Sequence, residues 1–188
     1  MQDSISRKDF LKNAFRLFKN EMGESSAKPI HKGNTYLYPP GIESVDNFLE
    51  TCRQSYNCIS VCPHEALQVF RDDENDPRYG FPQIKPRQAA CYYCTDFPCI
   101  DACKSAALSS NYKTRKLGLA VINTNLCFAY NDTYCQACIV NCPLTGKAIY
   151  TNQNNQPVIN EDFCNGCGLC VQSCPSQELT IVIQANLE

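Results

Sequence analysis

The feature that most constrains this chain is a set of 15 cysteines gathered into four blocks at nearly constant spacing. The blocks begin at Cys52, Cys91, Cys127 and Cys164, so the internal period is 36–39 residues. A period of this length is typical of chains built from a repeated structural unit. Small units of this kind bury few apolar side chains, so whatever the cysteines bind must contribute to folding.

The last block has the pattern C-x2-C-x2-C-x3-C-P, from Cys164 to Pro175. In bacterial ferredoxins this run binds [4Fe–4S] clusters, and its fourth cysteine ligates the neighbouring cluster. Disulfides impose no such spacing, and four-thiolate zinc sites usually separate two C-x2-C pairs. The pattern therefore predicts iron–sulfur clusters rather than disulfides or structural zinc.

The other three blocks are variants of this pattern. The second block is C-x2-C-x4-C-x3-C, the third is C-x7-C-x2-C-x3-C-P, and the first is C-x5-C-x3-C-P. A cysteine at Ser55 would make the first block identical in spacing to the last. We predict that the first block holds a [3Fe–4S] cluster or a [4Fe–4S] cluster ligated by the Ser55 oxygen. The alternative is a [4Fe–4S] cluster with an exogenous ligand at that iron.

We therefore expect three [4Fe–4S] clusters and one altered cluster. All 15 cysteines are predicted to ligate iron through sulfur, and Ser55 is predicted to lie at a cluster with them. The predicted cofactor-binding residues are Cys52, Ser55, Cys58, Cys62, Cys91, Cys94, Cys99, Cys103, Cys127, Cys135, Cys138, Cys142, Cys164, Cys167, Cys170 and Cys174. Because the last cysteine of a block crosses to another cluster, two pairings are open. Either the first block pairs with the fourth and the second with the third, or the first pairs with the second and the third with the fourth.

Short β-rich runs with brief helices between them predict an α+β fold of two tandem two-cluster ferredoxin-like modules. A helix is expected from Ser44 to about Thr51. The expected strands are residues 66–70, 81–84, 119–122, 148–151, 157–159 and 179–183. Residues 71–79 and 152–157 are charged or polar and are expected to be exposed connections.

Residues 1–41 are predicted to form an N-terminal helix and linker, and residues 42–188 the four-cluster domain. Residues 6–20 have the spacing of a basic amphipathic helix. Such a helix packs on its own protein or docks on a partner or membrane surface. Partner docking makes this segment the candidate contact for a redox partner protein.

Arg7 and Lys8 resemble a twin-arginine export motif, but Arg16 and Lys19 interrupt the apolar segment that export requires. We therefore expect a cytoplasmic protein, with a periplasmic one exported through a degenerate signal as the alternative. No apolar run is long enough for a transmembrane helix. The formal net charge is −2 and becomes more negative with bound clusters, which argues against nucleic-acid binding.

The sequence predicts an electron carrier and no catalytic residues. It has no G-x-G-x-x-G motif for flavin or nicotinamide and no C-x3-C-x2-C motif of radical enzymes. His64 follows Cys62-Pro63 and either tunes a cluster by hydrogen bonding or begins a helical turn. Tyr92, Tyr93 and the other aromatic residues of blocks two and three are expected to shield clusters from water.

Five segments carry a resemblance to a known family. They are Tyr38-Pro39-Pro40-Gly41, Cys91-Tyr92-Tyr93-Cys94, Pro98–Cys103, Gly118–Ile122, and Cys142-Pro143-Leu144 followed by Lys147-Ala148-Ile149. Together with the long third block, they resemble ferredoxin-type proteins of the periplasmic nitrate reductase and methylamine-utilisation systems (NapF, NapG and MauM types). The resemblance covers about residues 36–183, and Ser55 departs from it.

The resemblance implies four clusters and an electron-transfer role beside a molybdenum-dependent reductase such as nitrate reductase. It also implies the nested pairing, in which block 52–62 shares clusters with 164–174 and block 91–103 with 127–142. Two alternative functions follow from it. One is an assembly chaperone that binds the catalytic subunit, and the other is a fixed electron-transfer subunit of an oxidoreductase complex.

Overall fold

The computed structural model describes residues 36–176 and 179–185. These residues belong to one compact unit, Lys32–Glu188. The predicted basic helix at residues 6–20 lies outside the described residues. Within the described residues, no helix is long and apolar enough to cross a bilayer.

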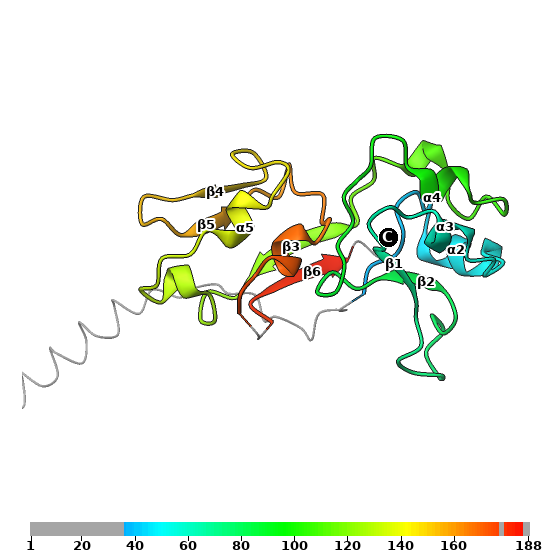
Figure 1. Ribbon diagram of the computed structural model, residues 1–188, viewed down its shortest axis with the longest axis horizontal. Helices are drawn as coiled ribbons and strands as arrows, with labels where there is room; N and C mark the ends of the chain where they lie inside the picture. Colours follow the sequence, from blue (N-terminus) through cyan, green and yellow to red (C-terminus); the bar gives the residue numbers. More distant parts are fainter. Residues whose placement is uncertain (1–35, 177–178, 186–188) are drawn as a thin grey trace, which may run out of the picture. The chain divides into compact units, whose positions relative to one another are not determined.

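The first part of the unit contains short elements around blocks one and two. They are α2 (Val45–Thr51), α3 (Asn57–Ser60), β1 (Leu67–Val69), β2 (Pro82–Ile84), α4 (Pro98–Asp101) and the 3-10 turn η1 (Ser110–Tyr112). Strands β1 and β2 form an antiparallel hairpin, and α3 packs against α4. Helix α2 begins where the Ser44 hydroxyl accepts a hydrogen bond from the Asn47 N–H at 3.1 Å, as an N-cap does. Figure 1 shows these helices gathered around the hairpin.

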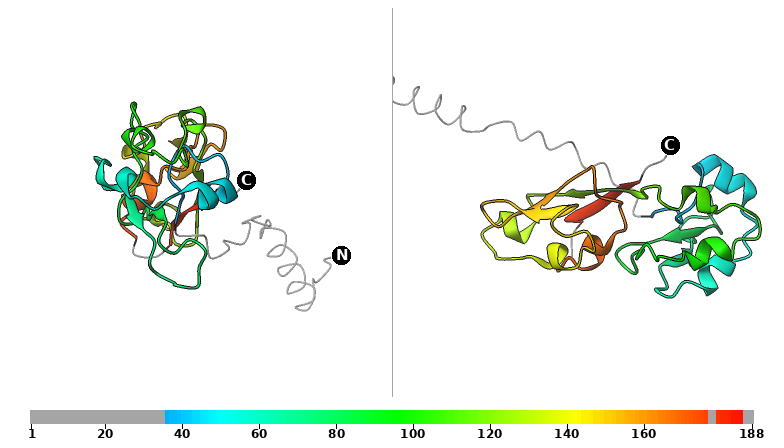
Figure 2. Two further views of the ribbon diagram at one scale, coloured as in Figure 1. Left: turned by 90° about the vertical axis from the view of Figure 1, so that its right-hand side faces the viewer. Right: turned by 90° about the horizontal axis from the view of Figure 1, so that it is seen from above.

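The second part contains the elements around blocks three and four. They are β3 (Gly118–Ile122), η2 (Phe128–Tyr130), α5 (Ala137–Val140), β4 (Ile149–Thr151), β5 (Pro157–Ile159), α6 (Leu169–Gln172) and β6 (Ile181–Ala185). Strands β4 and β5 form an antiparallel hairpin, β3 pairs antiparallel with β6, and α5 packs against α6. The views of Figure 2 also show β6 beside β3, with α5 close to β4. A hairpin therefore joins block one to block two, and another joins block three to block four.

The strands expected from the sequence are present, with ends shifted by one or two residues. The expected linker, however, ends before residue 41, because residues 36–41 are buried. Leu37 has no exposed surface, and its backbone pairs with Ile84 of β2 through two hydrogen bonds of 2.8 and 2.7 Å. The Tyr-Pro-Pro-Gly segment is thus part of the first hairpin's core, where its apolar side chains favour burial over a solvated connection.

Apolar side chains and cysteines share the core. Phe48, Ile84 and Ile149 are almost completely buried, and they belong to the same cluster of buried residues as Cys91 and Cys138. The apolar core alone is small for this length of chain. Folding is therefore expected to depend on what the thiols bind.

The segment after β2 joins the two parts. The Arg87 guanidinium donates to the carbonyl oxygens of Val171 at 3.1 Å, Cys174 at 3.0 Å, and Ser176. The Cys91 N–H donates to the Cys167 carbonyl at 3.0 Å. The second and fourth cysteine blocks are therefore held directly against each other.

Candidate metal-cluster sites

Every block has the same local framework, a loop followed by a single helical turn. The cysteine at the second residue of that turn is Cys58 in α3, Cys99 in α4, Cys138 in α5 and Cys170 in α6. The last cysteine of each block follows the turn. All 15 cysteines are free thiols, so none is used in a disulfide.

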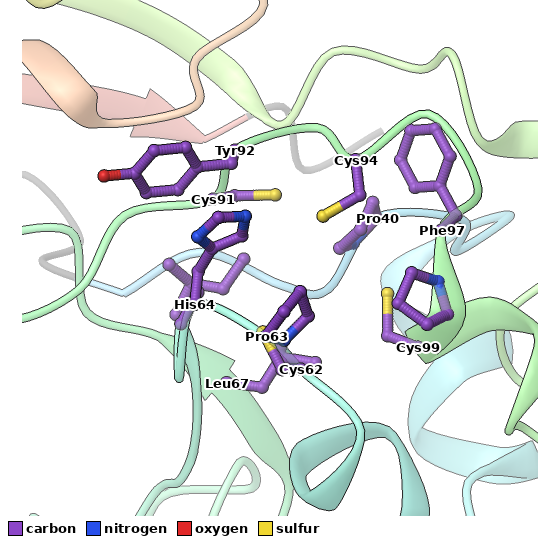
Figure 3. Close-up of a pocket in the computed structure, with 13 residues that line it drawn as sticks. Pro40, Cys62, Pro63, His64, Leu67, Cys91, Tyr92, Cys94, Phe97 and Cys99 are labelled. Atoms are coloured by element: carbon purple, nitrogen blue, oxygen red, sulfur yellow. The ribbon is translucent and has the colours of Figure 1, made fainter.

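Site 2 is a cavity in the first part of the unit. Its thiols are those of Cys91, Cys94 and Cys99 from block two and Cys62 from block one. In Figure 3 the sulfurs of Cys91, Cys94 and Cys99 point into the space between them, with Pro63 facing them from block one. Apolar residues, among them Leu67 and Phe97, complete the wall and restrict solvent, which helps to set the potential of a cluster.

Site 4 is a matching cavity in the second part. Its thiols are those of Cys164, Cys167 and Cys170 from block four and Cys142 from block three. Pro143 follows Cys142 in the wall as Pro63 follows Cys62 at site 2. The two spaces are also alike in size, about 390 Å³ here and 370 Å³ at site 2 with the open mouth included. The two cavities could therefore hold the same kind of group.

The remaining thiols form two further groups. Site 1 comprises Cys52, Cys58 and Cys103, with Ser55 at the position of the missing thiol, and site 3 comprises Cys127, Cys135, Cys138 and Cys174. The charges of Cys52 and Cys103 contribute to raising the pKa of Cys58, so these three thiols lie close together. Cys127, Cys135 and Cys174 affect the pKa of Cys138 in the same way.

The nested pairing expected from the family resemblance is wrong for this structure. Cys62 lies with block two rather than block four, and Cys142 lies with block four rather than block two. The reason is local. The β1–β2 hairpin folds block two back onto block one, and the β4–β5 hairpin does the same for blocks three and four. Consecutive elements joined by short connections usually become neighbours in space.

The loops that carry the second thiol of a block contain residues with left-handed backbone. Cys167 lies between Gly166 and Gly168, whose φ angles are 72° and 89°. Gln54 and Tyr56, with φ of 51° and 58°, flank Ser55 in the same way. Loops of this kind turn backbone N–H groups inward and make anion-binding concavities, including those of many iron–sulfur sites. Site 1 therefore keeps the loop conformation of a complete site.

Burial controls the charge state of the thiols. It is the largest cause raising the pKa of Cys91, Cys99 and Cys138 to about 12 and of Cys58 and Cys167 to about 11. Neighbouring thiols add to the shift because like charges oppose ionisation. Without a cationic centre these thiols stay protonated, so binding iron must release their protons.

The sulfurs of Cys91 and Cys103 accept backbone hydrogen bonds. The Tyr93 N–H lies 3.5 Å from the Cys91 sulfur, and the Leu108 N–H lies 3.4 Å from the Cys103 sulfur. Such bonds stabilise negative charge on sulfur and are among the factors that set cluster potentials. Leu108 was not among the residues expected at the site, and the cysteine spacing gave no signal for it.

His64 lines site 2 and stacks on Tyr92, with ring centroids 3.8 Å apart and planes at 11°. Tyr93 packs against buried residues that include Cys91 and Cys167, and it also makes polar contacts. Its hydroxyl donates to the Arg115 carbonyl at 2.8 Å and accepts from the Leu117 N–H at 3.1 Å. Tyr93 therefore ties the block-two loop to the chain entering β3.

At sites 2 and 4 the thiols surround a cavity rather than a single point. Within residues 36–176 and 179–185, no three Cys, His, Asp or Glu side chains come together closely enough to hold one metal ion. Thiols arranged around a space fit a polynuclear cluster ligated by four cysteines.

Comparison with known proteins yields several relatives. The chain is 32% identical over 162 residues to the methylamine utilization ferredoxin-type protein MauM of Methylorubrum extorquens, covering 80% of this chain and 72% of that protein. It is 28% identical over 198 residues to the ferredoxin-type protein NapG of Haemophilus influenzae, covering 94% and 71%. It is 29% identical over 156 residues to the ferredoxin-type protein NapF of Escherichia coli, covering 79% and 86%.

A family model for a 4Fe-4S dicluster domain matches residues 119–179. This segment begins in β3 and contains all of blocks three and four. No solved structure matches the chain.

Proposed function

The chain belongs to the family of ferredoxin-type proteins that includes MauM, NapG and NapF, and from this premise we propose that it relays single electrons through four iron–sulfur clusters. The observation that carries the proposal is the repeated wall of sites 2 and 4. In each, three thiols of one block meet the Cys-Pro of its neighbour. This is the arrangement of two-cluster ferredoxins, so the chain would be two such modules in tandem.

When bound, clusters supply one-electron redox chemistry, and the chain sets their potentials and their access to solvent. The thiols would ligate iron. The apolar walls would exclude water, and the N–H donors at Cys91 and Cys103 would favour the reduced form. At site 1, Cys52, Cys58 and Cys103 would hold a cluster that is [3Fe–4S] or completed by an oxygen ligand.

The packing supports an order of site 1, site 2, site 4, site 3 along the electron path, because α3 of block one packs against α4 of block two and α5 of block three packs against α6 of block four. The Cys58 thiol of site 1 is close enough to influence the pKa of Cys99 in site 2. The hydrogen bond from Cys91 to Cys167 connects sites 2 and 4. The Cys138 thiol of site 3 influences the pKa of Cys170 in site 4. Electrons would therefore enter at one outer site and leave at the other.

The proposed partner is a molybdenum-dependent reductase, as the family resemblance implies, and the relatives include the ferredoxin-type proteins NapG and NapF. Docking through residues 6–20 stays a prediction, since that segment lies outside the described residues. A cytoplasmic location also stays a prediction. Co-purification with a reductase under anaerobic conditions, with reoxidation of the reduced chain by that enzyme, would support this assignment.

Cluster content is the decisive test. Anaerobically purified protein should contain about 15 or 16 irons per chain with matching acid-labile sulfide, according to whether site 1 holds three or four irons. An EPR redox titration should resolve the site 1 signal from the others. A colourless preparation containing zinc, or one containing iron for only two clusters, would overturn the proposal.

A further inference from the structure

A polar cavity adjoins site 1. It is an open depression of about 710 Å³ with its mouth included, the measure given for sites 2 and 4, and about 400 Å³ of solvent-accessible volume. It is lined by Thr51, Arg53, Ser55, Asn57, Lys104 and Ser105. All six side chains are polar and two are cationic. The walls of sites 2 and 4 are instead mainly apolar side chains and thiols. Its lining therefore suits a hydrophilic ligand rather than the exclusion of water.

The cavity reaches the incomplete corner of site 1. Ser55, at the position of the missing thiol, lines the cavity and is exposed. The second cysteines of the other blocks, Cys94, Cys135 and Cys167, are not exposed. The Ser105 hydroxyl, also in the cavity wall, lies 3.6 Å from the Cys103 sulfur. A ligand in the cavity would thus lie next to the part of site 1 that lacks sulfur.

The charge of the cavity favours an anion. Arg53 and Lys104 are exposed, and neither pairs with a carboxylate within the part of the chain that the structure describes. Two unpaired cations together with hydroxyl and amide donors can bind a group carrying two negative charges. A volume of about 400 Å³ is within the range of small-molecule pockets.

We propose that this cavity binds a small dianion, carrying carboxylate or phosphate oxygens, through Arg53 and Lys104, and brings one of its oxygens to the site 1 iron that lacks a cysteine. The proposal rests on the proposed function in its four-iron form at site 1, because a three-iron cluster held by Cys52, Cys58 and Cys103 has no iron that lacks a cysteine. The dianion oxygen would exchange for a water ligand, or for the Ser55 oxygen, which would take up a proton from solvent as it returns to the hydroxyl, and no electron would be transferred.

The test uses the anaerobic, cluster-loaded full chain, with malonate and inorganic phosphate as probes. We expect at least one probe to change the EPR line shape of the site 1 cluster saturably, with chloride at equal ionic strength having no such effect. A response to malonate alone identifies a carboxylate site, a response to phosphate alone identifies a phosphate site, and a response to both identifies a general dianion site.

The variants Arg53→Gln and Lys104→Gln should each lower the affinity for the responding probe about ten-fold or more, because each removes a charged hydrogen-bond donor. The matched control is Lys147→Gln, an exposed lysine in the second part of the chain, which should leave the affinity unchanged. Iron content is measured for every variant, so that loss of a cluster is distinguished from loss of anion binding.

The inference fails alone if iron is about 15 per chain, because a three-iron cluster has no open iron for the anion. It also fails alone if iron is about 16 per chain while neither probe acts beyond chloride, or while both cavity variants bind as the parent does. Iron for only three clusters, with the site 1 signal missing, would instead overturn the proposed cluster at site 1 and this inference with it.

Discussion

At the scale of single residues, the position that most alters the chemistry is Ser55. The surrounding loop keeps the left-handed residues Gln54 and Tyr56, so the backbone still suits a cluster. What has changed is one ligand atom, from a soft thiolate to a harder oxygen. Because Ser55 is also exposed, water or another ligand can reach that position.

Replacing Ser55 with cysteine should complete site 1. We expect the Ser55→Cys protein to contain about 16 irons per chain and to lack a near-isotropic three-iron EPR signal in the oxidised state. Ser60→Cys is the matched control, because Ser60 is exposed at the end of α3 and adds a thiol outside the loop. A three-iron signal that persists in Ser55→Cys, or the same change in Ser60→Cys, would contradict this role for the position.

At the scale of elements, the block-four loop depends on close packing of glycine against β3. A Cβ on Gly166 would lie 2.4 Å from the backbone nitrogen and oxygen of Gly118, the first residue of β3. A backbone contact of this kind cannot be relieved by turning a side chain. A side chain at Gly166 would therefore displace either the site 4 loop or strand β3, which pairs with β6.

Gly166→Ala should consequently lower the free energy of unfolding by more than the strain of placing alanine in a left-handed backbone conformation would explain. Gly146→Ala is the control, because Gly146 has a similar φ of 77° but no atom within 4 Å of the added Cβ. We expect Gly146→Ala to lower the free energy of unfolding by about 1–2 kcal/mol, because alanine is strained in the left-handed conformation. Gly166→Ala should cost at least about 2 kcal/mol more, in the range of overpacking in a core. Thermal unfolding of the loaded protein, monitored by cluster absorbance, measures the difference, and equal losses would refute the steric explanation.

Strand β2 contains a second feature with a measurable consequence. Gln83 is 2% exposed, and within the described residues neither polar atom of its side chain has a hydrogen-bond partner. A buried unsatisfied amide costs about 1–3 kcal/mol. We expect Gln83→Met, which keeps the side-chain length, to raise the thermal midpoint by a few degrees. Gln68→Met, on the less buried cross-strand neighbour, is the control, and a lower midpoint for Gln83→Met would indicate a partner for the amide.

The elements were largely predictable from the sequence, whereas their pairing was predicted wrongly. Ser44 before an apolar helical pattern and the short apolar run at residues 157–159 are local signals, and both elements are present. Cluster pairing is not local, and equal spacing of the blocks does not favour one pairing. Residues 152–157 could have indicated the correct pairing, because a polar turn between two expected strands predicts a hairpin that brings blocks three and four together.

At the scale of the whole described unit, the two halves are joined by polar contacts that the cysteine pattern could not predict. A single guanidinium, that of Arg87, bonds three carbonyls at the end of block four. The Ala90 N–H also donates to the Gln172 side chain at 3.2 Å. These contacts hold site 2 against site 4, which is the step of the proposed electron path that crosses between the modules.

Removing Arg87 should weaken this junction while leaving the clusters in place, because Arg87 contacts backbone oxygens rather than sulfur. In fully reduced Arg87→Ala protein we expect the magnetic broadening between neighbouring clusters to decrease in the EPR spectrum, with iron content unchanged. Arg87→Lys should be intermediate, since lysine keeps the charge but lacks the planar fork that reaches several acceptors.

Arg71→Ala is the matched control, because Arg71 is an exposed arginine in the loop after β1. It should leave both the broadening and the iron content as in the parent protein. If Arg87→Ala keeps the parent spectrum, the junction does not depend on Arg87, and the backbone bond between Cys91 and Cys167 suffices to hold the inner sites together. If iron is lost instead, Arg87 supports the fold of block four itself, and the two modules are less independent than their separate hairpins indicate.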